Sequence, residues 1–480
     1  MKRSIELRMA VVAAVFVFAF AMSGLAQVSK PGSPRVPSNP TQLTSLRAPS
    51  APGTLFIPKS SQTQTPPAGH RFAANTNVEV FIPHGLRPEE TPPFPGYGYE
   101  TPASLGCHYG LVAGGSPTAA CNPNSTTVDP TGGSKTIAIV DAYDDPSAPG
   151  DLAWFSLQFG VPLTVSQFQV VWANTANSSC PVNLGEGVPT DYSGGWELEE
   201  SLDIEWAHAM APSANIYLVE ACSDYDSDLQ QAVLVANNLV QCGQTELNLT
   251  TGALGKCPGG STGLGEVSMS WGGSEFTGEN ASDTCATLDD SCFTATGVVY
   301  FAASGDGPGV IWPSTSPNVV SAGGTTIRRD PGTFNFEQET AWVFSGGGVS
   351  AIETKPGYQS PISNNQTAFR GVPDLSFDSD PYTGVYVYDT FPVEGIEYYE
   401  WLIVGGTSLS TQALAGIVNT AGSFALSSSA EITNIYTNRT NTAAITDITY
   451  GYCGYYMGLP TLSHWDYCTG VGVPNGYTGK

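Results

Sequence analysis

Residues 136–143 read Thr-Ile-Ala-Ile-Val-Asp-Ala-Tyr, a β-branched and apolar run of the kind that forms a buried strand. Further strand candidates follow along the chain, with helical stretches between several of them. The expected strands are 168–172, 215–221, 267–271, 298–303 and 319–322, and the expected helices are 196–210, 226–240 and 282–296. This alternation predicts an α/β fold with a mostly parallel central sheet and helices on both faces. In such sheets, functional groups gather at the carboxyl ends of the strands.

The N-terminal region is expected to lie outside the folded domain. Residues 1–26 have the layout of a secretory signal peptide, with a basic start, an apolar run and small residues before Gln27. An uncleaved anchor is the alternative, and no later segment has the unbroken apolar length of a membrane span. Residues 27–95 are rich in Pro, Ser, Thr and Gln, which predicts a linker or short pro-segment, with 78–83 as a candidate docked strand. The folded domain is therefore expected over 96–480.

Charge and cysteine content narrow the class of protein. The chain has 17 basic and 43 acidic residues, a formal net charge of -26, which argues against nucleic acid and anionic membranes as partners. Its ten cysteines form no Cys-x-x-Cys pair, which argues against a zinc ribbon or a thioredoxin-like site. Their even number indicates disulfides and an oxidising, extracellular compartment, with Cys285–Cys292 and Cys453–Cys468 as candidate local pairs.

A serine in a glycine turn is the first candidate catalytic residue. Gly406-Thr407-Ser408 leads into an apolar helix, so Ser408 would lie where free N–H groups and the helix dipole stabilise an oxyanion. The alternative is an ordinary helix N-cap. No Gly-Thr-His tripeptide supplies a histidine base, and the chain has no His-Glu-x-x-His, Walker or Rossmann motif. The Gly-x-Ser-x-Gly pattern at 259–263 lacks the preceding strand and following helix of a nucleophile elbow, so we interpret it as a loop.

Carboxylates supply candidate partners for this serine. Glu199 and Asp203 are four residues apart on the expected helix 196–210 and so share one face. Because paired carboxylates repel, one keeps a proton, and in acid the glutamate could accept the serine proton while the aspartate orients it. The alternative is a solvated acidic first turn. Asp306, in a glycine turn after strand 298–303, could donate a hydrogen bond to an oxyanion when protonated; the alternative is an ordinary turn aspartate.

Together these motifs resemble the sedolisins, serine-carboxyl peptidases with a subtilisin-like fold. The matching segments occur in the family's order: Thr101-Pro102, Tyr109-Gly110, Glu199-x-x-x-Asp203-Ile204-Glu205, Ala211-Pro212, Ser268-x-Ser270-Trp271-Gly272, Gly305-Asp306, 370–374 and Gly406-Thr407-Ser408. The resemblance implies an acid peptidase acting on proteins or peptides, with Ser408 as nucleophile and Glu199 as base. It further implies that Asp203 orients Glu199 and that Asp306 is an oxyanion donor. In some members an additional acid and a tryptophan extend the hydrogen-bond network, matching Asp141 and Trp271.

The resemblance also implies one structural calcium ion near the C-terminus and no redox cofactor. The matching residues are Asp447, Ile448, Leu462, His464 and Asp466. Two carboxylates with backbone carbonyls suit a hard, oxygen-seeking cation.

Two departures from the family leave alternatives open. The region between signal peptide and domain is shorter than a full pro-domain, and Leu409-Ser410-Thr411-Gln412 replaces the small residues and proline that usually follow the nucleophile. One alternative is an inactive extracellular binding protein with the same fold. Another is a glycosidase, although an i,i+4 carboxylate pair lies too close together to flank a sugar bond. We expect a secreted, monomeric, acid-active endopeptidase that forms an acyl-enzyme. Side-chain preference and tripeptidyl-peptidase action are left open.

Overall fold

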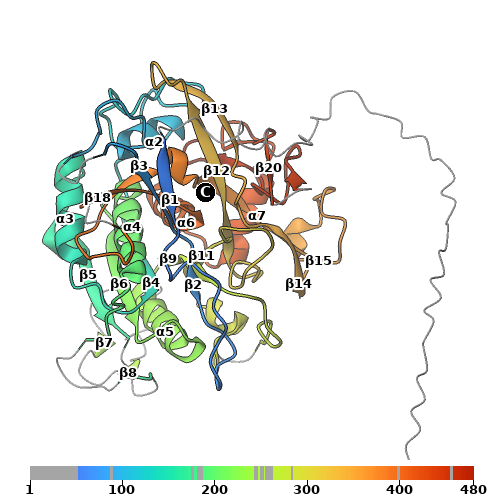
Figure 1. The fold of residues 1–480 in the computed structure, drawn as a ribbon. Helices are drawn as coiled ribbons and strands as arrows, with labels where there is room; N and C mark the ends of the chain where they lie inside the picture. The colour runs from blue at the N-terminus through green and yellow to red at the C-terminus, as the bar shows by residue number, and fades with distance from the viewer. Residues whose placement is uncertain are drawn as a thin grey trace, which may run out of the picture. The chain divides into compact units, whose positions relative to one another are not determined.

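The computed structural model describes most of the chain from residue 52 onward (Figure 1). The described residues are 52–86, 90–173, 178–180, 187–242, 247–248, 253–254, 263–282, 285–396, 400–454 and 458–480. The expected signal peptide and the loop 259–262 lie outside these ranges. Within them, no helix combines the length and apolar character needed to cross a membrane.

The central element is an eight-stranded sheet of order β13-β12-β11-β9-β4-β6-β5, with β16 also paired to β12. Its strands are β4 (Thr136–Ala142), β5 (Phe168–Trp172), β6 (Asn215–Ala221), β9 (Gly265–Met269), β11 (Val298–Ala303), β12 (Val320–Arg329), β13 (Phe336–Ala341) and β16 (Leu375–Asp378). All neighbouring pairs are parallel except β12 with β13. The predicted parallel sheet is confirmed. Strand β12 is longer than expected because its second half pairs with β13.

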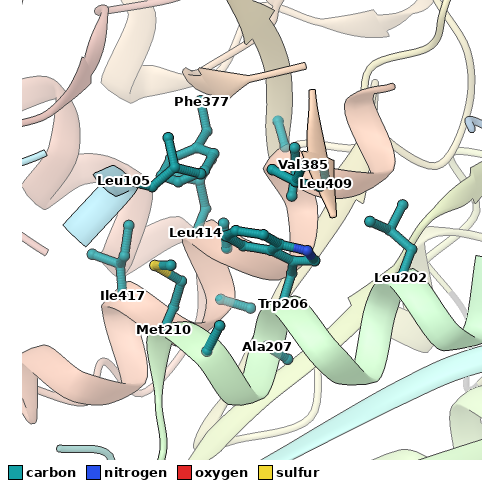
Figure 2. Packing of buried hydrophobic residues seen from close by; sticks show 14 of the residues in the cluster. Leu105, Leu202, Trp206, Ala207, Met210, Phe377, Val385, Leu409, Leu414 and Ile417 are labelled. Carbon is teal, nitrogen blue, oxygen red and sulfur yellow. The ribbon is translucent and has the colours of Figure 1, made fainter. Parts of the chain in front are cut away.

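Helices cover both faces of this sheet, as predicted. They include α3 (Ala148–Phe159), α4 (Gly195–Met210), α5 (Asp226–Cys242) and α6 (Thr407–Ala421). Alternate residues of β4 face opposite sides: Ile139 belongs to the apolar cluster containing α4 and α6, whereas Val140 belongs to the cluster containing α5. Figure 2 shows Trp206 and Met210 of α4 close to Leu414 of α6. The two helices that carry the candidate catalytic residues are thereby packed directly against each other.

A second sheet includes residues that the sequence assigns to the linker. It consists of β1 (Gly53–Phe56), β3 (Glu79–Pro83), β18 (Trp401–Gly405) and β17 (Val385–Tyr388), all antiparallel. In addition, β2 (Asn75–Thr76) pairs with β10 (Trp271–Gly272). Residues from 52 onward therefore include ordered strands of the fold, and β3 corresponds to the candidate docked strand at 78–83. The physical reason is burial, because Val78, Val80 and Phe81 lie in the main apolar cluster.

Shorter elements complete the chain. They are α2 (Pro102–His108), β7 (Leu247–Asn248), β8 (Ala253–Leu254), β14 (Gly348–Thr354), β15 (Phe369–Val372), α7 (Ser428–Thr437), β19 (Ile445–Thr446), β20 (Tyr452–Cys453), β21 (Leu459–Pro460) and β22 (Val473–Pro474).

The expected helix over 282–296 is wrong. In its described part only a 3₁₀ turn, η4 (Asp290–Phe293), is helical, and Asp289 caps it through the Ser291 amide. A disulfide joins Cys285 to Cys292 and closes the loop. The predicted Cys453–Cys468 pair is also confirmed, and two further disulfides join Cys107 to Cys121 and Cys180 to Cys222.

Candidate active site

The candidate nucleophile lies where β18 ends and α6 begins. Ser408 is the second residue of α6 and is fully buried. The preceding Gly406 has φ = +119°, and an added Cβ would lie 2.0 Å from the Asn77 carbonyl oxygen, so only glycine fits here. The Ser408 amide donates to that same Asn77 oxygen at 3.2 Å, and the Ser408 hydroxyl donates to the Ser270 carbonyl at 3.1 Å.

Asp306 follows β11 and reaches the same turn. Its Oδ1 accepts hydrogen bonds from both the amide and the hydroxyl of Thr407, each at 2.8 Å. Its Oδ2 is shielded from solvent and has no hydrogen-bond partner among the described residues. Burial raises the pKa of Asp306 to about 7. A Cβ added at Gly406 would lie 2.6 Å from this Oδ2 and 2.0 Å from the Asn77 carbonyl oxygen. The two oxygen atoms are therefore close neighbours beside Gly406. When protonated, Asp306 can therefore donate toward an oxygen held by the Ser408 amide.

The two predicted carboxylates of α4 face this turn. Glu199 and Asp203 are both fully buried. Burial, and next the charge of Asp141, raise the pKa of Glu199 well above its usual range, while the nearby Ser408 hydroxyl and Asn77 amide oppose the rise. Neither Glu199 oxygen makes a hydrogen bond of good geometry to a described side chain. Glu199 is thus a buried carboxyl beside the serine hydroxyl.

Asp203 is held more firmly than Glu199. One of its oxygens accepts from the Ser270 hydroxyl at 2.9 Å, and the other accepts from the Gln412 side-chain amide. Gln412 also donates to the Ser270 hydroxyl at 3.0 Å. Burial raises the pKa of Asp203, and the neighbouring charges of Asp141 and Glu199 raise it further. The buried carboxyl groups of Asp141, Glu199 and Asp203 therefore influence one another's ionisation.

The expected extension through Asp141 and Trp271 differs from the structure. The Trp271 indole donates to the backbone carbonyl of Val140 at 2.7 Å rather than to the Asp141 carboxyl. The carboxyl group of Asp141, near the end of β4, has no hydrogen bond to a described residue, and burial raises its pKa to about 8. Its contribution to the site is electrostatic, through Glu199 and Asp203.

Sequence reasoning missed three residues of this site. Gln412 occurs one helical turn after Ser408, a spacing that places it on the same helix face toward α4. Ser270 belongs to the Ser-x-Ser-Trp-Gly motif, but nothing in the sequence links it to Asp203. Asn77 carries no sequence signal, because its contact with Ser408 spans more than three hundred positions.

The predicted calcium residues come together in one loop region. The Asp447 carboxylate accepts from the His464 amide at 2.9 Å, and the Asp466 carboxylate accepts from the amides of Leu462, Cys468 and Thr469. Ile448 follows Asp447 and is buried. Among the described residues, no group of three or more His, Cys, Asp or Glu side chains is placed to hold a metal ion. The oxygen-rich pair Asp447 and Asp466 is of the kind that suits calcium, provided that backbone carbonyls complete the shell.

Known proteins resemble this chain in part. No family model matches the sequence. Sedolisin from Pseudomonas sp. (strain 101) is 32% identical over 179 residues, covering 34% of this chain and 28% of that protein. Kumamolisin from Bacillus sp. (strain MN-32) is 31% identical over 307 residues, covering 59% of this chain and 47% of that protein. The matched chain thus spans less than half the length of these curated relatives. The solved structure of Pseudomonas sedolisin, a serine-carboxyl proteinase complexed with two molecules of pseudo-iodotyrostatin, aligns with a TM-score of 0.57 at 22% identity. It covers 78% of this chain and 95% of that one.

The parallel sheet and the serine at the N-terminus of α6 define a protein of subtilisin-like fold, in which buried carboxyl groups face the serine. Within that class the similarities are to serine-carboxyl members. The chain thus resembles the sedolisin family in sequence and in fold.

Proposed function

We propose that this chain is a secreted, acid-active serine-carboxyl endopeptidase that acts on proteins or peptides through an acyl-enzyme at Ser408. The observation that carries the proposal is the meeting of Ser408, Glu199 and Asp306 at the start of α6. The similarity to kumamolisin and to the solved structure of a serine-carboxyl proteinase supports the same chemistry.

In the proposed mechanism, Ser408 Oγ attacks the carbonyl carbon of a peptide bond. Glu199 accepts the serine proton and returns it to the leaving amine, and a water molecule then hydrolyses the ester by the same route. The Ser408 amide and protonated Asp306 stabilise the oxyanion. Asp203, fixed by Gln412, keeps Glu199 in place and limits the charge that can accumulate beside it.

Acid operation follows from burial of the carboxyl groups. Asp306 must keep its proton to act as a donor, and its pKa of about 7 allows this only below neutral pH. The raised pKa values of Glu199 and Asp203 keep protons in the cluster over the same range. Activity is therefore expected to fall as the pH rises toward 7.

Peptide substrates would bind along the strand edges that flank the serine, in the place that residues 75–77 occupy in this structure. Strand β10 pairs antiparallel with β2, and the chain continues from β2 past Ser408 into β3. A chain can thus extend on both sides of the nucleophile, which favours endopeptidase over tripeptidyl-peptidase action. Secretion is supported by the N-terminal apolar segment and the disulfides.

The proposal includes a structural calcium ion held by the carboxylates of Asp447 and Asp466 and by carbonyls of Ile448, Leu462 and His464. Its contribution would be to fix the loop between these residues. The expected result of EGTA treatment is a lower melting temperature that added calcium restores. Asp447→Asn should abolish this calcium dependence, and an unchanged melting temperature in EGTA would remove calcium from the account.

The direct test of the function is digestion of a denatured protein between about pH 2 and 8 by the wild type, Ser408→Ala and Glu199→Gln. Cleavage confined to acid pH and lost in both variants is the expected result. Folded wild-type protein that cleaves nothing at any pH would overturn the proposal and favour the inactive binding protein.

A further inference from the structure

Three aromatic rings beside the candidate active site surround a fourth. The Phe72 side chain is only 2% exposed. Its ring centroid lies 5.3 Å from that of Trp312, 5.7 Å from that of Phe276 and 6.2 Å from that of Trp271. These separations are those of offset and edge-to-face aromatic pairs, so the three rings form a pocket that fits one more ring. We call the rings of Trp271, Phe276 and Trp312 the aromatic cage.

A glycine beside the cage leaves the space that the fourth ring takes. A Cβ added at Gly273 would lie 2.7 Å from Cε2 of Phe72, closer than a real Cβ contact allows. The amide and the carbonyl of Gly273 exchange hydrogen bonds with those of Trp312, each at 2.9 Å. This pairing joins the stretch after β10 to the wall that carries Trp312. The space for a ring is therefore built into the backbone beside the site.

The walls of the cage are held in place by other contacts. The Trp271 indole donates to the Val140 carbonyl at 2.7 Å, and the Trp312 indole donates to the Asp290 carboxyl group at 3.1 Å. The rings of Phe276 and Trp312 also contact each other, with centroids 5.2 Å apart. Because these side chains are already ordered, a ring that enters the cage spends little of its binding energy on rearranging them.

The segment that carries Phe72 is an extended peptide held on both edges. On one edge, β2 pairs antiparallel with β10. On the other edge, the Ala74 amide donates to the Asp224 carbonyl at 2.8 Å, and the Phe72 carbonyl accepts from the Asp226 amide at 3.3 Å. A peptide held in this way keeps its register, so each of its side chains meets a defined part of the protein.

This register sets the separation between the cage and the serine. The Asn77 carbonyl accepts from the Ser408 amide at 3.2 Å, where a substrate carbonyl would be attacked. Phe72 precedes Asn77 by five positions, a span of about 16 Å in an extended chain. A substrate in the same place would therefore set the side chain of its sixth residue before the cut in the cage.

We propose that the aromatic cage is a remote substrate subsite, which selects polypeptides with an aromatic or large aliphatic residue at the sixth position before the cleaved bond. This inference rests on the proposed peptidase function, with substrates taking the place that residues 72–77 have in this structure. Phe72 shows the kind of side chain that fits. Only substrates that extend at least six residues before the cut gain this contact, which suits an endopeptidase.

The contribution of the cage should appear in kcat/KM. Burial of one large apolar side chain changes a binding constant by about tenfold or more. Because the cage lies far from the reacting atoms, it binds the ground state and the transition state alike, so the gain is expected in KM rather than in kcat. A serine side chain at the same position buries almost no apolar surface and should gain none of this energy.

The test compares two peptides that differ at one position. Both contain a bond that the full-length chain cleaves in a denatured protein at about pH 4, and the sixth residue before that bond is phenylalanine in one and serine in the other. The wild type should cleave the phenylalanine peptide with a kcat/KM about tenfold or more higher. A peptide shortened to five residues before the bond should be cleaved like the serine peptide.

Matched variants show whether the cage is the source of this preference. Phe276→Ala opens one wall and should lower the ratio of the two kcat/KM values about three- to tenfold. Phe369→Ala removes an exposed ring on β15, outside the cage, and should leave the ratio unchanged. Because both peptides are cleaved by the same enzyme sample, the ratio does not depend on how much of a variant is folded.

The outcomes separate this inference from the function on which it rests. Equal kcat/KM values for the two peptides, or a preference that Phe276→Ala leaves unchanged, would overturn the cage as a subsite and leave the peptidase function standing. A folded chain that cleaves neither peptides nor denatured protein would overturn the peptidase function, and this inference with it.

Discussion

Buried carboxyl groups on α4 make the stability of this protein depend steeply on pH, and Glu197 allows the effect to be measured. Its side chain has no exposed surface, and burial raises its pKa from 4.5 to about 9. A carboxyl with a raised pKa in the folded state binds a proton more tightly there than in the unfolded chain. Its stabilising contribution is complete below about pH 4.5 and is lost as the pH rises toward 9.

The magnitude follows from this pKa difference. Each pH unit between the two values removes about 1.4 kcal/mol of folding free energy, so raising the pH from 5 to 7 removes about 2.7 kcal/mol through Glu197 alone. Glu197→Gln keeps the shape of the protonated acid but cannot ionise. The free energy of unfolding should therefore fall about 2–3 kcal/mol less in the variant than in the wild type over this interval.

The assay is urea unfolding at about pH 5, 6 and 7, with Ser408→Ala as the common background so that self-digestion cannot interfere. Asp330→Asn is the matched control, because hydrogen bonds from Thr333 lower the pKa of Asp330, so this carboxyl stays ionised in the folded and unfolded chain over the whole interval. Other buried acids act equally in both proteins and cancel in the comparison. If the free energy of unfolding fell equally with pH in the Glu197→Gln variant and in the protein that keeps Glu197, the reasoning would be refuted.

Substitutions at three places in the structure test other parts of the account. Asp306→Asn places a permanent donor where Oδ2 lies, so activity at about pH 4 should persist and the loss of activity near pH 7 should weaken. Asp306→Ala removes the donor and should lower kcat about 10²–10³-fold. A pH profile of activity that is unchanged in Asp306→Asn would count against Asp306 as the titrating donor. Gln412→Leu removes the two hydrogen bonds that the Gln412 amide donates to Asp203 and Ser270, so kcat should fall about 10–100-fold with little change in KM. A change in KM alone would contradict a positioning role for Gln412. Replacing Cys285 and Cys292 by serine should lower the free energy of unfolding by about 2–3 kcal/mol in urea titrations, and no change would mean that the loop is held by other contacts.

The sequence predicts the central sheet well because its strands are continuous apolar runs buried on both faces. The bounds of β5, β6 and β11 agree with the expected ranges to the residue. The helix expected over 282–296 fails for a local reason, since a disulfide and an aspartate cap stabilise a turn that composition alone does not indicate.

Of the N-terminal strands, only β3 is indicated by local pattern, as the candidate strand over 78–83, whereas β1 and β2 could not be predicted in this way. Strands β1, β2 and β3 are two to five residues long, too short for a period to show, and two of them pair with segments nearly two hundred or more positions away. Figure 1 shows them, in blue, among elements of the later chain. Their stability comes from tertiary partners rather than from propensity.

The site was predictable to the extent that its residues belong to short motifs. Ser408, Glu199, Asp203 and Asp306 come from three separate segments, and the structure brings all four residues to the start of α6. The orienting role of Gln412 could not be predicted, because it depends on how α4 and α6 pack.

The central claim is that Ser408 forms an acyl-enzyme, and mass spectrometry of a rapidly acid-quenched reaction tests it most directly. With a peptide ester substrate at about pH 4, the account predicts an acyl adduct on the peptide that contains Ser408, and none in Ser408→Ala. Turnover without any adduct on Ser408, or an adduct on a different residue that survives in Ser408→Ala, would contradict it.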